Sequence, residues 1–280
     1  MVDLNNLEEI QKLDPKNVFG STGMLSPQCE QIWNEGKSLS FPANYKFIEN
    51  IVIAGMGGSA YGGHVVLSLF RNQLKIPFII HSDYGLPQFV NENSLVVLES
   101  YSGSTEESLS AGEEAKKRGA KITGLTSGGK LAEFLKFNNY PSLIFDPKHN
   151  PSGQPRLASG YMVLGTIALL NQMRLLNVSD QEVSNTVENL NKQQKNIMEK
   201  AKTLAQEIQG YIPVIFAAEH LVGNAHILRN QFNETSKSFS AFEDIPELNH
   251  HLLEGLKNPP IHDTWRATPD TLKYVQTKKQ

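Results

Sequence analysis

The sequence predicts a doubly wound α/β fold, in which a parallel, flavodoxin-like sheet is covered by helices on both faces. Short apolar runs of strand length recur in the first half of the chain, at residues 51–54, 78–80, 95–98, 122–125 and 142–145. Segments with a helical pattern separate these runs, among them residues 61–70 and 106–118. Apolar runs of this kind suit strands buried on both faces, and their alternation with helices favours a parallel sheet.

The composition is that of a globular protein and excludes several classes of function. The chain has 280 residues, 39% hydrophobic and 20% charged, with a net charge of −3. It therefore has no global positive field for nucleic acid or an anionic membrane surface. The single cysteine, Cys29, excludes an intramolecular disulfide and a cysteine-rich zinc site, and favours the reducing cytoplasm. The sequence shows neither a signal peptide nor an apolar run near the roughly 18 to 20 residues of a membrane span.

The predicted secondary structure changes along the chain. An apolar periodicity from Leu4 to Leu13 indicates a helical start, and long helical patterns at residues 157–176 and 181–209 follow the strand-rich part. A new strand at 213–218 and a helix at 224–233 then indicate a second α/β unit. We therefore expect a helical lead-in at 1–45, a first α/β domain at 46–155, connecting helices at 156–210, and a second half at 211–280 that is shortened at its C-terminus.

A glycine-rich turn follows the first predicted strand. Residues 55–60 read Gly-Met-Gly-Gly-Ser-Ala and lead into a helical segment, an arrangement that points backbone N–H groups at an anion. The same turn also allows a strand and a helix to pack closely without a ligand. In addition, Gly55, Gly57 and Ala60, with Asp83 after the second strand, nearly match the dinucleotide fingerprint. A plain tight turn and an NAD-dependent oxidoreductase therefore stay open as alternatives.

The exit of the third strand favours a phosphate site. Residues 99–107 read Glu-Ser-Tyr-Ser-Gly-Ser-Thr-Glu-Glu, with several hydroxyl groups around one glycine at the start of a helix. Such donors suit three phosphate oxygens, and an oxidoreductase has no need of this loop. A further polar turn at 126–130 is either an ordinary capped turn or part of the site. Because ligands collect at the carboxyl ends of parallel strands, all three turns can meet in one pocket.

Four segments carry the motifs of a known family. They are Gly-Met-Gly-Gly-Ser at 55–59, Ser-Tyr-Ser-Gly-Ser-Thr-Glu-Glu at 100–107, Asn-Glu at 233–234 and Pro-Glu-Leu-Asn-His at 246–250. In combination they resemble the bifunctional phosphoglucose/phosphomannose isomerase family of the SIS (sugar isomerase) fold, over about residues 40 to 256. Ser104 stands where many members have asparagine. The resemblance implies that the phosphate of a hexose 6-phosphate is held by Gly57, Gly58, Ser59, Ser100, Ser102 and Thr105.

The resemblance also implies three catalytic residues. Glu234 matches the family's base, which moves a proton between C1 and C2, and Arg156 matches an arginine near the C1–C2 end of the substrate. His250 matches a histidine that assists ring opening and reaches the active site of the partner subunit.

Structural roles without a catalytic function stay open as alternatives for these residues. A glutamate such as Glu234 is more often a solvated surface group, and Arg156 could cap a helix junction. His251 and the pair Glu219 and His220 are rivals of His250. No histidine spacing of a metal-binding helix is present, so a metal site is not expected.

The function implied by the resemblance is an isomerase that interconverts glucose 6-phosphate, and mannose 6-phosphate, with fructose 6-phosphate through a cis-enediol(ate). Neither a metal nor a nucleotide cofactor is expected, and the enzyme would be a cytoplasmic homodimer of glycolysis and gluconeogenesis. The family usually has a longer second half that ends in a helix with an active-site lysine. Lys273, Lys278 and Lys279 lie in no recognisable version of that segment. A catalytically degenerate protein that binds sugar phosphates in a regulatory role is therefore the alternative.

Overall fold

The first unit is built on a five-stranded parallel sheet with the strand order β2-β1-β3-β4-β5. The computed structural model describes residues 3–255. Its first five strands are β1 (Asn50–Gly55), β2 (Phe78–His81), β3 (Ser94–Glu99), β4 (Lys121–Thr126) and β5 (Ser142–Ile144). All neighbours pair in parallel, and this order is the flavodoxin-like one. The predicted fold class is therefore confirmed.

The position of β3 separates this sheet from a nicotinamide-binding one. In the dinucleotide-binding order the third strand lies outside the second. Here β3 pairs directly with β1, with Leu95 opposite Ile51, and Asp83 follows β2 at the edge of the sheet. The near match to the dinucleotide fingerprint therefore reflects a tight turn in a sheet of another topology, and the oxidoreductase alternative loses its support.

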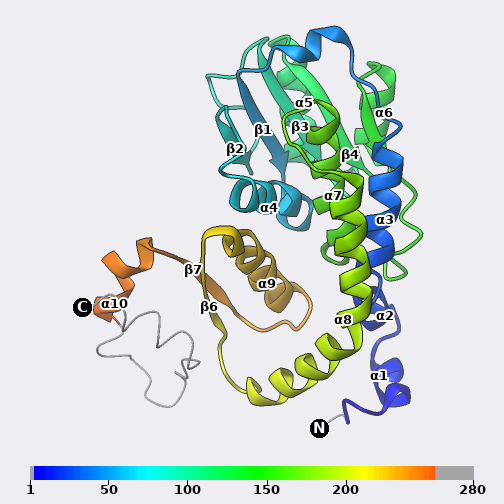
Figure 1. Cartoon of the computed structure of the whole chain (residues 1–280), viewed down its shortest axis with the longest axis vertical. Helices are drawn as coiled ribbons and strands as arrows, with labels where there is room; N and C mark the ends of the chain where they lie inside the picture. Colours follow the sequence, from blue (N-terminus) through cyan, green and yellow to red (C-terminus); the bar gives the residue numbers. More distant parts are fainter. Residues whose placement is uncertain (1–2, 256–280) are drawn as a thin grey trace.

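Helices cover both faces of the sheet, as Figure 1 shows. Alternate residues of β1 enter two different cores: Ile51 and Ile53 pack in the layer of α3 and α7, and Val52 and Ala54 in the layer of α5 and α6. This is why the strands read as unbroken apolar runs. The helices of this unit are α3 (Leu25–Gly36), α4 (Tyr61–Leu69), α5 (Glu106–Lys117), α6 (Gly129–Phe137) and α7 (Ser159–Gln172).

One long helix leads from the first unit to the second (Figure 1). It is α8 (Asp180–Glu207), and it begins with a capping box in which the Ser179 hydroxyl accepts from the Glu182 backbone N–H at 3.2 Å. The short helices of the chain are α1 (Leu7–Leu13), α2 (Val18–Thr22), α10 (Leu252–Gly255) and the 3₁₀-helices η1 (Ala43–Lys46), η2 (Gly57–Ala60), η3 (Pro155–Leu157), η4 (Glu219–Leu221) and η5 (Glu247–His250).

The second unit contains a strand that the sequence analysis did not name. Its sheet consists of β6 (Val214–Ala218) and β7 (Ala241–Ile245), which pair in parallel and are connected by α9 (Val222–Glu234). The β7 segment carries Glu243 and Asp244 in its centre, so no apolar run marks it. Its place follows from the β–α–β crossover, which brings it beside β6.

A close contact between α4 and α9 joins the two units (Figure 1). A Cβ atom on Gly223 would lie 2.5 Å from the His64 carbonyl oxygen, so only glycine fits here. The Gly223 backbone N–H donates to the Ser68 hydroxyl at 3.2 Å and fixes the contact. The start of α9 is thereby held against the first unit, and its far end, with Glu234, extends towards the β1 turn.

Glu99 is a buried carboxyl group at the end of β3. Its Oε1 lies 2.5 Å from the Thr166 hydroxyl of α7, and that hydroxyl lies 2.7 Å from the Met162 carbonyl oxygen. A hydroxyl has one proton, and a carbonyl can only accept. If Thr166 donates to Met162, the Glu99 carboxyl must carry the proton that joins it to Thr166. Burial raises the pKa of Glu99 to about 8, and the hydrogen bond with Thr166 acts in the opposite direction.

We expect Glu99 to make the protein less stable as the pH rises. The folded state keeps the Glu99 proton up to about pH 8, whereas the unfolded chain releases it near the ordinary pKa of 4.5. Its stabilising contribution is therefore complete below pH 4.5 and decreases towards pH 8. Glu99→Gln does not titrate, and its amide can donate to Thr166. Its free energy of unfolding in urea should thus rise relative to that of the wild type between pH 4.5 and 8.5.

Glu133→Gln, on the exposed side of α6, is the control for loss of one carboxyl group. A difference between Glu99→Gln and wild type that stays constant over this pH range would show that Glu99 is ionised in the folded protein.

Candidate functional site

The β1 turn forms the floor of the site. In η2, Gly57 has φ +52° and is exposed, and a Cβ atom on Gly58 would lie 3.1 Å from the Arg156 Cα atom. The first position needs glycine because of its left-handed backbone, and the second because Arg156 packs against it. The two glycines therefore bring the turn into contact with the η3 segment.

The β3 loop lies beside this turn and presents hydroxyl groups. The Ser59 hydroxyl accepts from the Tyr101 backbone N–H at 2.9 Å, which ties the two loops together and leaves its own proton for a ligand oxygen. The Ser100 hydroxyl accepts from the Gly103 N–H at 3.1 Å and lies 2.7 Å from the Thr105 hydroxyl, so one proton of this pair also stays available. Ser102 is exposed at the entrance. These groups surround the N-terminal end of α5, which favours an anion.

The β4 turn supports the β3 loop from behind. The Ser127 hydroxyl donates to the Tyr101 carbonyl at 2.7 Å, and the Leu131 N–H donates to the Gly103 carbonyl at 2.9 Å. A Cβ atom on Gly103 would lie 1.7 Å from the Gly128 carbonyl oxygen, so the two loops are in close contact. Because the Ser127 proton is already used, these contacts favour the ordinary structural role for the turn at 126–130.

A cavity of about 370 Å³ opens next to the β1 turn and contains Glu234. Its lining comes from the β1 turn, α4, the end of β2 and α9, and consists of Gly57, Ala60, His64, Ser82, His226, Arg229, Asn230, Asn233 and Glu234. The structure thus brings Glu234 of the second unit to the glycine turn of the first. Glu234 is half-buried at the last position of α9, so it is not a fully solvated surface group.

Tyr61 lies at the base of this region and was missed by the sequence analysis. Its side chain is fully buried. Burial raises its pKa to about 12, and the charge of Glu234 adds to this effect, whereas the nearby Asn230 side chain and the charges of Arg229 and Arg156 lower it. The neutral hydroxyl group is therefore surrounded by the carboxylate and by two guanidinium groups.

Arg156 is held against the end of α9. Its Nε donates to the Thr235 hydroxyl at 3.1 Å, and its Nη1 donates to the Gln154 side-chain carbonyl at 2.8 Å. Its backbone carbonyl accepts from the Gln231 side chain. These bonds use two of the five guanidinium N–H groups and fix Arg156 beside Thr235, the neighbour of Glu234. The contact also joins η3 to α9, so Arg156 links two elements that are distant in the sequence.

His250 does not line this cavity within the chain. It lies exposed at the end of η5, and His251 next to it is also exposed. Glu219 forms an ion pair with Arg71 at 3.6 Å, and neither Glu219 nor His220 lines the cavity. Lys273, Lys278 and Lys279 lie outside the described residues. The described residues of one chain therefore bring together the glycine turn, Glu234 and Arg156, but not His250.

The sequence carries a weak signal for the cavity residues that were missed. His226, Arg229, Asn230 and Asn233 follow a spacing of three and four residues along α9. Such a spacing places them on one face of the helix, and a polar face normally points to solvent. Here this face looks into the cavity because Gly223, one turn before His226 on the same side of the helix, holds that side of α9 against α4.

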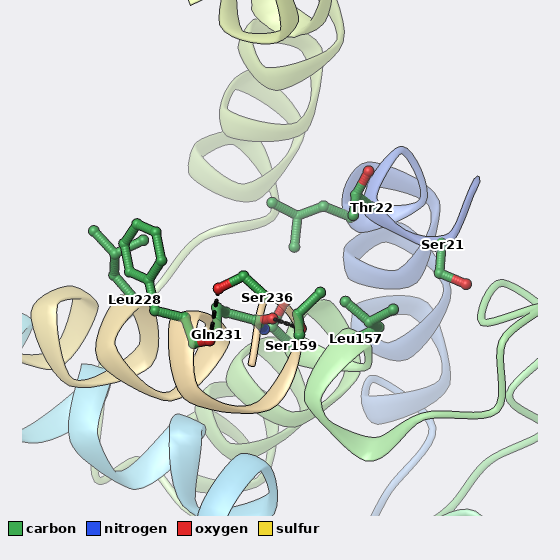
Figure 2. A pocket seen from close by; sticks show the side chains of 10 residues that line it. Ser21, Thr22, Leu157, Ser159, Leu228, Gln231 and Ser236 are labelled. Atoms are coloured by element: carbon green, nitrogen blue, oxygen red, sulfur yellow. Dashed lines mark hydrogen bonds between the residues drawn. The ribbon is translucent and has the colours of Figure 1, made fainter. Parts of the chain in front are cut away.

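A second cavity, of about 390 Å³, lies where α2 and α3 meet η3, α7 and α9. Figure 2 shows that Leu228 and Gln231 of α9 are separated by it from Thr22 and Ser21. Its lining is apolar or uncharged and comprises Ser21, Thr22, Leu25, Leu157, Ser159, Leu228, Gln231, Phe232, Thr235 and Ser236. Without an ionisable side chain it offers no acid or base, so we place the candidate site in the first cavity.

Two histidines of the first cavity stack on each other. The rings of His64 and His226 have centroids 3.7 Å apart and an interplanar angle of 20°. Burial lowers the pKa of both to about 4, and the charge of Arg229 contributes in each case. Both rings are therefore neutral near pH 7. No group of three or more histidine, cysteine or acidic residues able to hold a metal occurs among residues 3–255.

Comparisons with known proteins identify relatives over most of the chain. Residues 48–134 match the SIS domain, and residues 197–270 match the bacterial phospho-glucose isomerase C-terminal SIS domain. A bifunctional phosphoglucose/phosphomannose isomerase of Caldicellulosiruptor bescii is 34% identical over 93% of this chain and 81% of its own length. One of Aquifex aeolicus is 36% identical over 77% of this chain and 64% of its own.

A solved structure with a similar fold is a hypothetical protein of Thermus thermophilus. It has a TM-score of 0.64 and is 18% identical, and the match covers 91% of this chain and 68% of the other. At this identity the likeness concerns the fold alone. In residues 3–255, no helix combines the length and the apolar character that crossing a membrane requires.

The stacked histidines lead to an expected loss of stability in acid. In the unfolded chain a histidine binds a proton near pH 6.5, whereas in the folded protein each ring does so only near pH 4. The stabilising contribution of the pair is therefore complete above pH 6.5 and decreases as the pH falls towards 4. His226→Phe keeps an aromatic ring in the stack but removes one of the two titrating groups. We expect its free energy of unfolding to fall less steeply than that of the wild type between pH 6.5 and 4.

Urea unfolding at several pH values measures this difference. His220→Gln, an exposed histidine outside the cavity, is the control and should follow the wild-type profile. Parallel profiles for His226→Phe and wild type would show that the stacked pair does not resist protonation.

Proposed function

The chain belongs to the bifunctional phosphoglucose/phosphomannose isomerase family, and we infer that it is an isomerase that interconverts glucose 6-phosphate, and mannose 6-phosphate, with fructose 6-phosphate. The observation that best supports this activity is that Glu234 lines the same cavity as Gly57, next to the hydroxyl-rich β3 loop. A carboxylate and an anion-binding loop are thereby available to one small phosphorylated sugar. The comparisons give no support to a catalytically degenerate regulatory protein.

The substrate phosphate would bind between the β1 turn and the β3 loop. The protons that Ser59 and the pair of Ser100 and Thr105 leave unused would be donated to its oxygens, together with backbone N–H groups of Gly57, Gly58 and Ser102. Binding of this remote group would hold the sugar in one orientation over Gly57, so that binding energy becomes positioning at C1 and C2.

Glu234 would transfer the proton. From the open-chain aldose it takes the proton at C2, the bonding pair becomes the C1–C2 double bond, and the C1 carbonyl oxygen takes up the negative charge. This oxygen then gains a proton, the O2 hydroxyl loses one, and Glu234 returns its proton to C1, which yields the ketose. Arg156, fixed beside Thr235, would stabilise the negative charge of the enediolate.

His250 would act in the active site of a partner subunit. Its side chain is exposed on η5 and does not line the cavity of its own chain, which agrees with a role in a homodimer. There it would open the sugar ring by moving a proton between the ring oxygen and the O1 hydroxyl. We further propose a cytoplasmic location, a role in glycolysis and gluconeogenesis, and the four-part division of the chain at residues 45, 155 and 210.

Replacement of the base should remove the reaction but not the binding. Glu234→Gln keeps the shape of the side chain and cannot accept the C2 proton, so we expect turnover to fall about a thousandfold. Formation of glucose 6-phosphate from fructose 6-phosphate and from mannose 6-phosphate measures this, and thermal stabilisation by either sugar phosphate should persist. Glu188→Gln on the exposed side of α8 is the control. A parent rate in Glu234→Gln would exclude Glu234 as the base.

A mixed dimer tests whether His250 acts across subunits. Glu234→Gln and His250→Ala chains, co-expressed with different tags and isolated as the mixed dimer, would combine the intact Glu234 of one chain with the intact His250 of the other. One of the two sites is then complete, so we expect roughly half of the wild-type activity by symmetry. If each site uses residues of one chain only, the mixed dimer is inactive, and a monomer in sedimentation would also contradict the proposal.

A further inference from the structure

The cavity that contains Glu234 also contains a cation without an assigned role, Arg229. It lies on α9, five residues before Glu234, and lines the same cavity as Gly57 and Ser82. Its Nε is buried and has no hydrogen-bond partner, and none of the ion pairs among residues 3–255 involves it. A buried polar group without a partner costs free energy, so a substrate oxygen that accepts a hydrogen bond from this group would be bound favourably.

The surroundings of Arg229 hold its charge in place but do not neutralise it. The guanidinium carbon lies 5.4 Å from the centroid of the Phe242 ring, which packs edge-on against His226 with centroids 5.5 Å apart. The positive charge contributes to the lowered pKa of both His64 and His226, so these rings are neutral neighbours. Tyr61, whose pKa is raised, is neutral as well. Among residues 3–255, Glu234 is the one carboxylate that lines the cavity.

The position of Arg229 places it at the end of the site that is remote from the phosphate. The β3 loop lies on one side of the β1 turn, and none of its residues lines the cavity. The cavity extends to the other side, to Ser82 at the end of β2. A sugar whose phosphate is held at the β3 loop therefore crosses Gly57, and its opposite end enters the cavity beside Glu234 and Arg229.

We propose that Arg229 binds the oxygen atoms at C1 and C2 of the substrate and stabilises the negative charge that forms on them. The inference rests on the proposed isomerase activity. When Glu234 removes the C2 proton, the electron pair of the C1 carbonyl moves onto O1, and Arg229 offers its unused N–H groups to this oxygen. Arg156 has two of its N–H groups committed to Thr235 and Gln154, whereas Arg229 has none committed to a described residue.

A pair of ligands separates this role from phosphate binding. Arabinonate 5-phosphate has a carboxylate where the enediolate oxygens form, and arabinitol 5-phosphate has a neutral CH₂OH group there, with the same phosphate at the other end. A protein that stabilises an enediolate should bind the acid more tightly than the alcohol. Calorimetric titration of the full-length wild type with each ligand measures this preference.

Arg229→Gln should remove the preference and not the phosphate binding. We expect its affinity for arabinonate 5-phosphate to fall about 100-fold, its affinity for arabinitol 5-phosphate to stay within about twofold, and turnover of fructose 6-phosphate to fall about 100-fold. Arg71→Gln, an exposed arginine paired with Glu219, is the control for loss of one positive charge and should bind both ligands as the wild type does.

Each result decides the proposal. Equal losses for the two ligands, or none, in Arg229→Gln would overturn it, as would a wild type that binds them equally. If Arg229→Gln does not fold, Arg229→Lys takes its place: a lysine has no planar fork, so we expect about tenfold weaker binding of the acid alone, and unchanged binding would overturn the proposal. Failure of the isomerase assignment is recognised separately. In that case the wild type would bind neither of the two sugar-phosphate ligands and would not turn over fructose 6-phosphate.

Discussion

The site depends on the contact between α4 and α9. Gly223 allows the backbone of α9 to approach the His64 carbonyl to a distance that no side chain would permit, and its N–H group donates to Ser68. This contact connects the two units, which are also joined by the hydrogen bonds between Arg156 and α9 and by the long helix α8. Because α4 begins directly after the β1 turn, α9 contacts both α4 and that turn. Glu234, at the end of α9, therefore reaches Gly57.

Charge and burial are distributed unevenly around this contact. The proposed phosphate end consists of neutral hydroxyl groups and backbone N–H groups at a helix terminus, which would bind an anion through dipoles. The opposite end contains the formal charges of Glu234, Arg156 and Arg229, set among neutral rings and the Tyr61 hydroxyl. A reaction in which negative charge forms at one end of a phosphorylated sugar matches this distribution, since the phosphate and the enediolate would be held by different groups.

The protonation state of Glu99, in the core below the site, also favours the binding of an anion. Glu99 lies at the end of β3, next to Ser100, and its carboxyl group is joined to Thr166, which also faces the Met162 carbonyl. A neutral Glu99 can donate a proton to Thr166 and places no buried negative charge below the β3 loop. An ionised Glu99 at this position would oppose the binding of an anion a few residues away.

The sequence by itself determined the first sheet and the glycine-rich and serine-rich loops at its edge. Strands buried on both faces are continuous apolar runs, and glycine and serine turns after β1 and β3 meet at one edge in any parallel sheet, so local patterns were sufficient. It also contained the motifs that led to Glu234, Arg156 and His250. Only the tertiary structure decided which of them meet: Glu234 and Arg156 lie beside the β1 turn, whereas His250 is exposed elsewhere. The sequence also did not predict strand β7, which has charged residues at its centre, or the inward direction of the polar face of α9. A strand of this kind is defined by its partner, and a polar helix face is directed inward only by contacts far away in the chain, as Gly223 does here.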